Sequence, residues 1–211
     1  MTTEERTQRL LDLGKAEFGR LTWAEATILR AMAQGTVADF SVEGEDDIPG
    51  SELLQMAHRW RGETCTIEAD RLVWFCTDPQ VAAEVTFRGL RVKGLRVEGE
   101  WNLEQATVGF PLEFRGCLFA GVLNFSQGNF KSLSLVGCEV LPPPQGADVL
   151  LNLDDTTVQE SVDLTDSLFR NKGKNSLWAD RSEITGQFLL TGRFESEGYV
   201  GITGAQIGLI A

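Results

Sequence analysis

From about position 90 onward, an apolar residue recurs at about every fifth position. The first units read LRVKG, LRVEG, WNLEQ and ATVGF, with single residues inserted between some of them. The central residue of a unit is apolar in almost every case, and the residue two positions earlier is large in some units and small in others. Regularly placed large and small side chains are what a stacked core requires, so the period predicts a repeat architecture.

The long insertions recur at one place in the repeat. When the units are numbered as faces one to four from Leu90, LPPPQGADVL and NKGKNS each follow a second face, and a short irregularity lies near Glu197 on the next one. A β-sandwich would not hold a five-residue phase while confining its insertions in this way. We therefore predict a mainly β fold, a right-handed four-sided β-helix of about five coils, over residues 85–211.

Residues 1–84 have a different pattern. Apolar residues spaced as on a helix, among charges, predict helices over residues 4–18 and 23–34, with Thr22 and Glu25 as a capping box for the second. An acidic loop follows, and then a third helix with Ser51 as its N-cap.

A fourth helix is predicted over residues 67–76, with Thr66 as its N-cap and Asp78-Pro79 at its end. Its apolar residues surround much of the helix, so we expect it to be buried. The first coil of a solenoid leaves backbone groups and apolar side chains open, and this helix is the candidate cap. The chain is thus divided into a helical region with a cap, residues 1–84, and the β-helix.

Charge narrows the classes of function. The net charge of −12 argues against direct binding of nucleic acid or of an anionic membrane. Residues 1–84 hold 16 acidic and 8 basic residues, and residues 85–211 hold 15 and 11. Because no apolar run approaches the roughly 20 residues of a membrane span and no signal-type N-terminus is present, we expect a cytoplasmic protein.

Residue types that carry chemistry are sparse. Four cysteines and one histidine, His58, offer no zinc-type spacing, and no nucleophile motif or phosphate loop appears. Cys117 and Cys138 fall one coil apart at the same inward position, so we expect stacked core thiols. The sequence favours a protein that is not an enzyme and that uses no cofactor or metal.

The units LEFRG, CLFAG, LNFSQ and VDLTD resemble the pentapeptide-repeat family, whose unit has a small residue, a polar residue and a central Leu or Phe. The block RWRGETCTIEADRLVWFCTDP and the repeats after it look like the opening of a group of uncharacterised bacterial pentapeptide-like proteins. The resemblance implies the fold, whereas functions on such stacks are unrelated to one another.

The first functional hypothesis is a protein-binding or scaffold module that works through the second-face corner, where two long loops would stack. Its candidate partner-binding residues are Leu118, Leu141, Pro142, Pro143, Pro144, Leu168, Lys172 and Lys174. The leucines point outward and would form an exposed apolar strip unless the N-terminal helices cover it. The prolines form either a rigid elbow or a polyproline ligand. The lysines either contact an acidic partner or only keep the loop solvated.

The last coil is a candidate self-association surface. The repeat is still in phase at Ala211, so the final coil needs a cover, either a second copy in a homodimer or further coils of a longer chain. The candidate contact residues are Ile202, Ile207 and Leu209.

Two alternatives come from other classes. Some pentapeptide-repeat proteins resemble duplex DNA in shape and charge and occupy the DNA site of a topoisomerase; here the basic residues of the first coil count against this. The other is a carbohydrate-active β-helix enzyme that would use clustered acids and an arginine. Its candidates are Asp154, Asp155, Asp163, Asp166, Asp180 and Arg181.

Asn102, Asn124 and Asn152 recur before the central residue of face three and predict a hydrogen-bonded ladder between coils.

Overall fold

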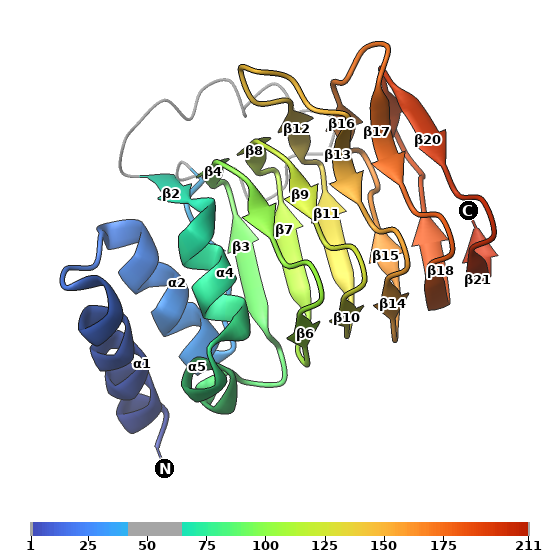
Figure 1. Cartoon of the computed structure of the whole chain (residues 1–211). Coiled ribbons are helices and arrows are strands. Elements are labelled where there is room, and N and C mark those ends of the chain that lie inside the picture. Colours follow the sequence, from blue (N-terminus) through green and yellow to red (C-terminus); the bar gives the residue numbers. More distant parts are fainter. Residues whose placement is uncertain (1, 42–64, 211) are drawn as a thin grey trace.

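The computed structural model describes residues 2–41 and 65–210, which form a parallel β-solenoid of about five coils preceded by helices (Figure 1). Within the coils each strand pairs in parallel with the corresponding strand of the next coil, so that Leu90 lies beside Leu112, and Leu112 beside Leu133. Four strands are stacked in this way in each coil, as the spacing of the insertions predicted. The fold is mainly β, in agreement with the sequence.

The strands form three sheets. Faces one and four belong to a 10-stranded sheet because β18 runs continuously from the fourth face of one coil into the first face of the next. Its strands are β1 (Ala38–Asp39), β3 (Leu90–Lys93), β7 (Leu112–Arg115), β11 (Leu133–Val136), β15 (Val162–Asp163), β18 (Glu183–Leu189), β14 (Thr157–Val158), β10 (Asn129–Phe130), β6 (Thr107–Val108) and β21 (Gln206–Ile210).

The other two faces are separate sheets. Face two is 6-stranded, with β2 (Thr66–Glu68), β4 (Arg96–Glu98), β8 (Leu118–Ala120), β12 (Glu139–Leu141), β16 (Leu168–Phe169) and β19 (Glu195–Ser196). Face three is 5-stranded, with β5 (Trp101–Asn102), β9 (Leu123–Asn124), β13 (Val149–Asn152), β17 (Asn175–Trp178) and β20 (Tyr199–Gly201).

The helices are α1 (Thr3–Phe18), α2 (Trp23–Gln34), α4 (Ala69–Thr77) and α5 (Pro79–Glu84). The capping box of Thr22 and Glu25 is confirmed at the start of α2, and Thr2 and Glu5 form a second one at the start of α1. In the described ranges no helix has both the length and the hydropathy that a membrane span needs. The helix predicted from Ser51, and His58, lie outside the described residues.

The start predicted for the fourth helix is wrong. Thr66 is not an N-cap; it begins β2, which pairs with β4, and α4 starts at Ala69. Pairing with Arg96–Glu98 gives the backbone groups of β2 hydrogen-bond partners that a local helix signal cannot anticipate. The second half of the prediction is correct, since α4 ends at Thr77 and Asp78 is its C-cap.

The first coil is covered by elements from residues 1–84. In Figure 1 the helices gather at one end of the rod, and the C-terminus lies at the other. Strands β1 and β2 extend the stack beyond β3 and β4, and α4 packs against β5 with Leu72 and Phe75 fully buried. These elements shield the open backbone edge and the apolar end of the first coil.

The interior is filled by columns of side chains stacked one coil apart. Trp101 lies at its centre in the first coil, with its ring 5.0 Å from that of Phe114 and 6.0 Å from that of Phe119. Cys117 and Cys138 are fully buried and directly precede the paired strands β8 and β12, one coil apart as predicted. Burial raises the pKa of the Cys138 thiol well above its usual range, so this thiol is a core group with little thiolate character.

Close stacking leaves no room for a side chain at Gly121. A Cβ atom there would lie 2.0 Å from the carbonyl oxygen of Gly99, one coil earlier, whereas a Cβ at Gly109 would meet nothing within 4 Å. We expect Gly121→Ala to lower the free energy of unfolding by about 1–3 kcal/mol, because the stacked backbones must move apart. Gly109→Ala is the matched control and should be neutral or slightly stabilising. Urea denaturation followed by circular dichroism measures both, and equal midpoints would contradict the tight stacking.

Candidate functional site

The two long insertions meet at the second-face corner, defined here as residues 142–148 and 170–174. Asn171 joins them: its Nδ2 donates to the carbonyl oxygen of Ala147 at 3.3 Å and to that of Asn175 at 2.7 Å. Asn171 is buried, with only 5% of its surface exposed. The loops of two successive coils are therefore fixed to each other by a buried amide.

Within this corner, Arg170 links three successive coils. Its Nε donates to Glu139 Oε1 and its Nη1 to Glu197 Oε1, each at 2.6 Å. The hydrogen bond that Arg170 donates to Glu139 is the main cause that raises the pKa of Arg170. Because Glu139 is buried, with 1% exposure, the guanidinium is held in one position.

An exposed ion pair closes the corner. Lys174 Nζ lies 2.8 Å from Asp148 Oδ1, and this contact raises the pKa of the lysine and lowers that of the aspartate. Both side chains face solvent, so this ion pair contributes little to the free energy of folding and mainly orients the two side chains.

A groove of about 430 Å³ runs between the two loops. It is lined by Pro142, Gln145, Gly146, Ala147, Asp148, Arg170, Asn171, Lys172 and Lys174. A second hollow of about 290 Å³ lies on the other side of the first loop and is lined in part by Pro143, Glu100 and Val122. The first loop thus has open space on both sides.

The structure brings some of the predicted partner-binding residues together. Pro142, Lys172 and Lys174 line the groove, and Pro143 lines the second hollow. Pro144 is exposed at the tip of the first loop. Arg170, Asn171 and Gln145 were not among the residues predicted from the sequence, where their one signal was a position in or beside an insertion.

The predicted apolar strip is not an open surface. Leu118 and Leu168 are buried, with 4% and 7% exposure, and Leu141 is half-buried. Glu139 lies between Leu118 and Leu168 in the same row of face two, so a charged group bound to Arg170 interrupts the strip. Buried side chains offer no surface to a partner, and these two leucines are not anchors in this conformation.

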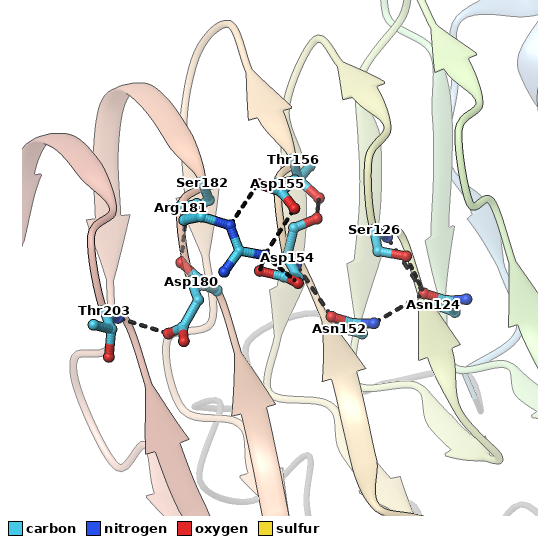
Figure 2. Close-up of polar contacts among 11 residues, drawn as sticks. Asn124, Ser126, Asn152, Asp154, Asp155, Thr156, Asp180, Arg181, Ser182 and Thr203 are labelled. Carbon is cyan, nitrogen blue, oxygen red and sulfur yellow. Dashed lines mark hydrogen bonds and ion pairs between the residues drawn. The ribbon is translucent and has the colours of Figure 1, made fainter.

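The asparagine ladder predicted on face three is present, and Figure 2 shows its contact between Asn152 and Asn124. Asn152 Nδ2 donates to Asn124 Oδ1 at 3.3 Å, and Asn124 Nδ2 donates to Asn102 Oδ1 at 3.5 Å. Each Oδ1 also accepts a backbone N–H two residues further along the chain, as with Asp154. The ladder holds the turns of consecutive coils in register.

The acidic candidates on face three are held in ion pairs and hydrogen bonds. Figure 2 shows the Arg181 guanidinium over Asp154 and Asp155, with Nη2 2.8 Å from an oxygen of each. Asp180 lies one coil from Asp154, and its Oδ1 accepts the backbone N–H of Thr203 at 2.6 Å. The hydrogen bond from Arg181 lowers the pKa of Asp155. A general acid requires a raised pKa. The lowered pKa of Asp155 instead fits an ion pair that links two coils.

The last coil exposes side chains that are core residues in earlier coils. Ile207 and Ile210 pair with Ile184 and Phe188, which are 1% and 0% exposed, yet Ile210 is 52% exposed and Ile207 is half-buried. Among the other self-association candidates, Ile202 is 37% and Leu209 52% exposed. These residues form an apolar end surface, together with Tyr199 and Val200.

Residues 2–41 and 65–210 contain no group of three or more His, Cys, Asp or Glu side chains placed to hold a metal ion. Comparison with known proteins found no matching family model, no matching curated protein and no matching solved structure. Function is therefore inferred from the geometry of the chain itself.

Asn171→Ala removes the amide that joins the two loops. We expect amide hydrogen exchange to accelerate in residues 143–148, and the free energy of unfolding to fall by about 1–2 kcal/mol, because two neutral hydrogen bonds are lost. Lys174→Ala removes only an exposed ion pair and is the control; it should leave exchange in the first loop nearly unchanged. If the two variants exchange alike, Asn171 does not fix the loops.

Proposed function

We propose that the protein is a non-enzymatic protein-binding or scaffold module that contacts its partner through the second-face corner. The observation that carries this proposal is the fixation of two loops from successive coils by Asn171, around a groove. Loops that are already ordered lose little conformational entropy on binding, so more of the contact energy appears as affinity. Loops confined to one side of a repeat protein are commonly its binding side.

Charge pairing on the rod favours this function over the alternatives. A mimic of DNA needs rows of free carboxylates, but on face one Glu113 lies between Arg91 and Arg115, at 2.7 and 2.8 Å. An acid-catalysed hydrolase needs two carboxyl groups that share a substrate, and Asp154 and Asp155 are instead bound by Arg181. These pairs support protein contact as the working mode of the molecule.

A photo-crosslinking amino acid at Gln145 tests the proposal, with Gln159 as a matched exposed glutamine on face four. In cells that naturally make the protein, we expect irradiation to give one discrete adduct with the Gln145 variant and none with the Gln159 variant. Excess unmodified protein should compete the adduct away, because the site is saturable. Equal adducts at both positions, or none at either, would refute the second-face corner as the contact surface.

We further propose that the protein forms a homodimer through its last coil. Elements of residues 1–84 cover the first coil, whereas Ile202, Leu209 and Ile210 are exposed on the last. Contact between two identical ends closes around a two-fold axis and does not propagate into a fibre. A second copy would remove this apolar surface from water.

Light scattering of Ile207→Lys with Leu209→Glu tests the homodimer. We expect the unmodified protein to have the mass of a dimer and this variant that of a monomer, because two charges must be desolvated at the contact. Thr157→Lys with Gln159→Glu places the same charges on the side of the rod and should remain a dimer. A monomeric unmodified protein at all concentrations, or dimers of all three, would exclude the last coil as the interface.

A further inference from the structure

We propose that the groove between the two loops binds a carboxylate group on an acidic peptide segment of the partner. This inference rests on the proposed function of the second-face corner and specifies the chemistry of what binds there. The charged residues of the groove lining are the first observation that supports it. The groove lining contains three basic residues, Arg170, Lys172 and Lys174, and one acidic residue, Asp148, in a chain of 31 acidic and 19 basic residues.

Two cationic groups in this lining have hydrogen-bonding capacity to spare. Arg170 uses Nε and Nη1 for its two glutamates, and its Nη2 donates to no group in residues 2–41 and 65–210. Lys172 is exposed and makes neither an ion pair nor a hydrogen bond with the described part of the chain. A carboxylate has two oxygens that accept charge-assisted hydrogen bonds, so it matches a lysine and an arginine that face one groove.

Arg170 and the loop that carries Lys172 are held in place before a ligand arrives. Arg170 is fixed by the buried Glu139, and the loop that carries Lys172 is fixed through Asn171. The two carboxylates of Glu139 and Glu197 more than neutralise Arg170, and Asp148 pairs with Lys174, so Lys172 is the one cation of the groove lining that has no ion pair within the described residues. Recognition should therefore depend on short-range contacts with Lys172 more than on long-range attraction.

The rest of the lining fits a peptide better than a bare anion. Pro142 and Ala147 give the groove an apolar wall, and the carboxylate of Asp148 and the side-chain amide of Gln145 can accept hydrogen bonds from peptide N–H groups. A small inorganic anion has no apolar surface and no N–H group to use them.

Fluorescence anisotropy with two labelled peptides tests the inference. One alternates glutamate and glycine, the other replaces each glutamate by glutamine, and both have blocked termini. We expect the glutamate peptide to bind roughly tenfold more tightly, a difference of about 1.4 kcal/mol, because only its carboxylate makes a charge-assisted contact with Lys172. Lys172→Glu should abolish this preference and Lys172→Arg should keep it. Arg20→Glu, the same charge change in the exposed α1–α2 turn, should leave binding unchanged.

Several results would overturn the inference. These are equal binding of the two peptides, equal effects of Lys172→Glu and Arg20→Glu, or inorganic phosphate that binds alone and displaces the peptide at similar concentration, which would indicate a site for small anions. Crosslinking at Gln145 without preference for the glutamate peptide would leave the proposed function intact and refute only the acidic ligand. Failure of both experiments would refute both.

Discussion

In-register parallel pairing between successive coils is the constraint on which the rest of the structure depends. It places each residue directly between the equivalent residues of the coils before and after it, as Phe114 lies between Val92 and Leu135. Which side chain fits at a position is therefore determined less by its neighbours in the sequence than by its column, the equivalent residues of the coils before and after it. Inward columns must have complementary volumes, and outward columns must avoid like charges less than 5 Å apart.

The outward polar columns show how this second requirement is met. On face three an asparagine amide both donates and accepts, so Asn102, Asn124 and Asn152 stack without repulsion. Where acids stack, an arginine one coil away binds them, as Arg181 binds Asp154. In these columns the polar groups are thus used in contacts between coils. Groups free to bind something else appear where the columns are interrupted, at the inserted loops that carry Lys172.

The sequence was sufficient to predict the features that recur from coil to coil. The five-residue phase predicted the coils, the stacked Cys117 and Cys138, and the asparagine ladder, because a column can be written down once the period is known. It did not predict β2, because Thr66–Glu68 becomes a strand only by pairing with β4, some 30 residues later. Nor did it identify Arg170, whose partners come from the coils before and after and whose role exists only after stacking.

The corner and the end surface are both places where the regular stacking of the coils is altered. At the corner, insertions replace the regular turn; at the end, Ile210 is 52% exposed although its paired residue Phe188 is fully buried. If two copies join through their last coils, one particle carries two grooves related by a two-fold axis. A partner with two acidic segments could then occupy both, and the second binding event would be intramolecular. Weak recognition of single carboxylates would thereby gain avidity without any new contact.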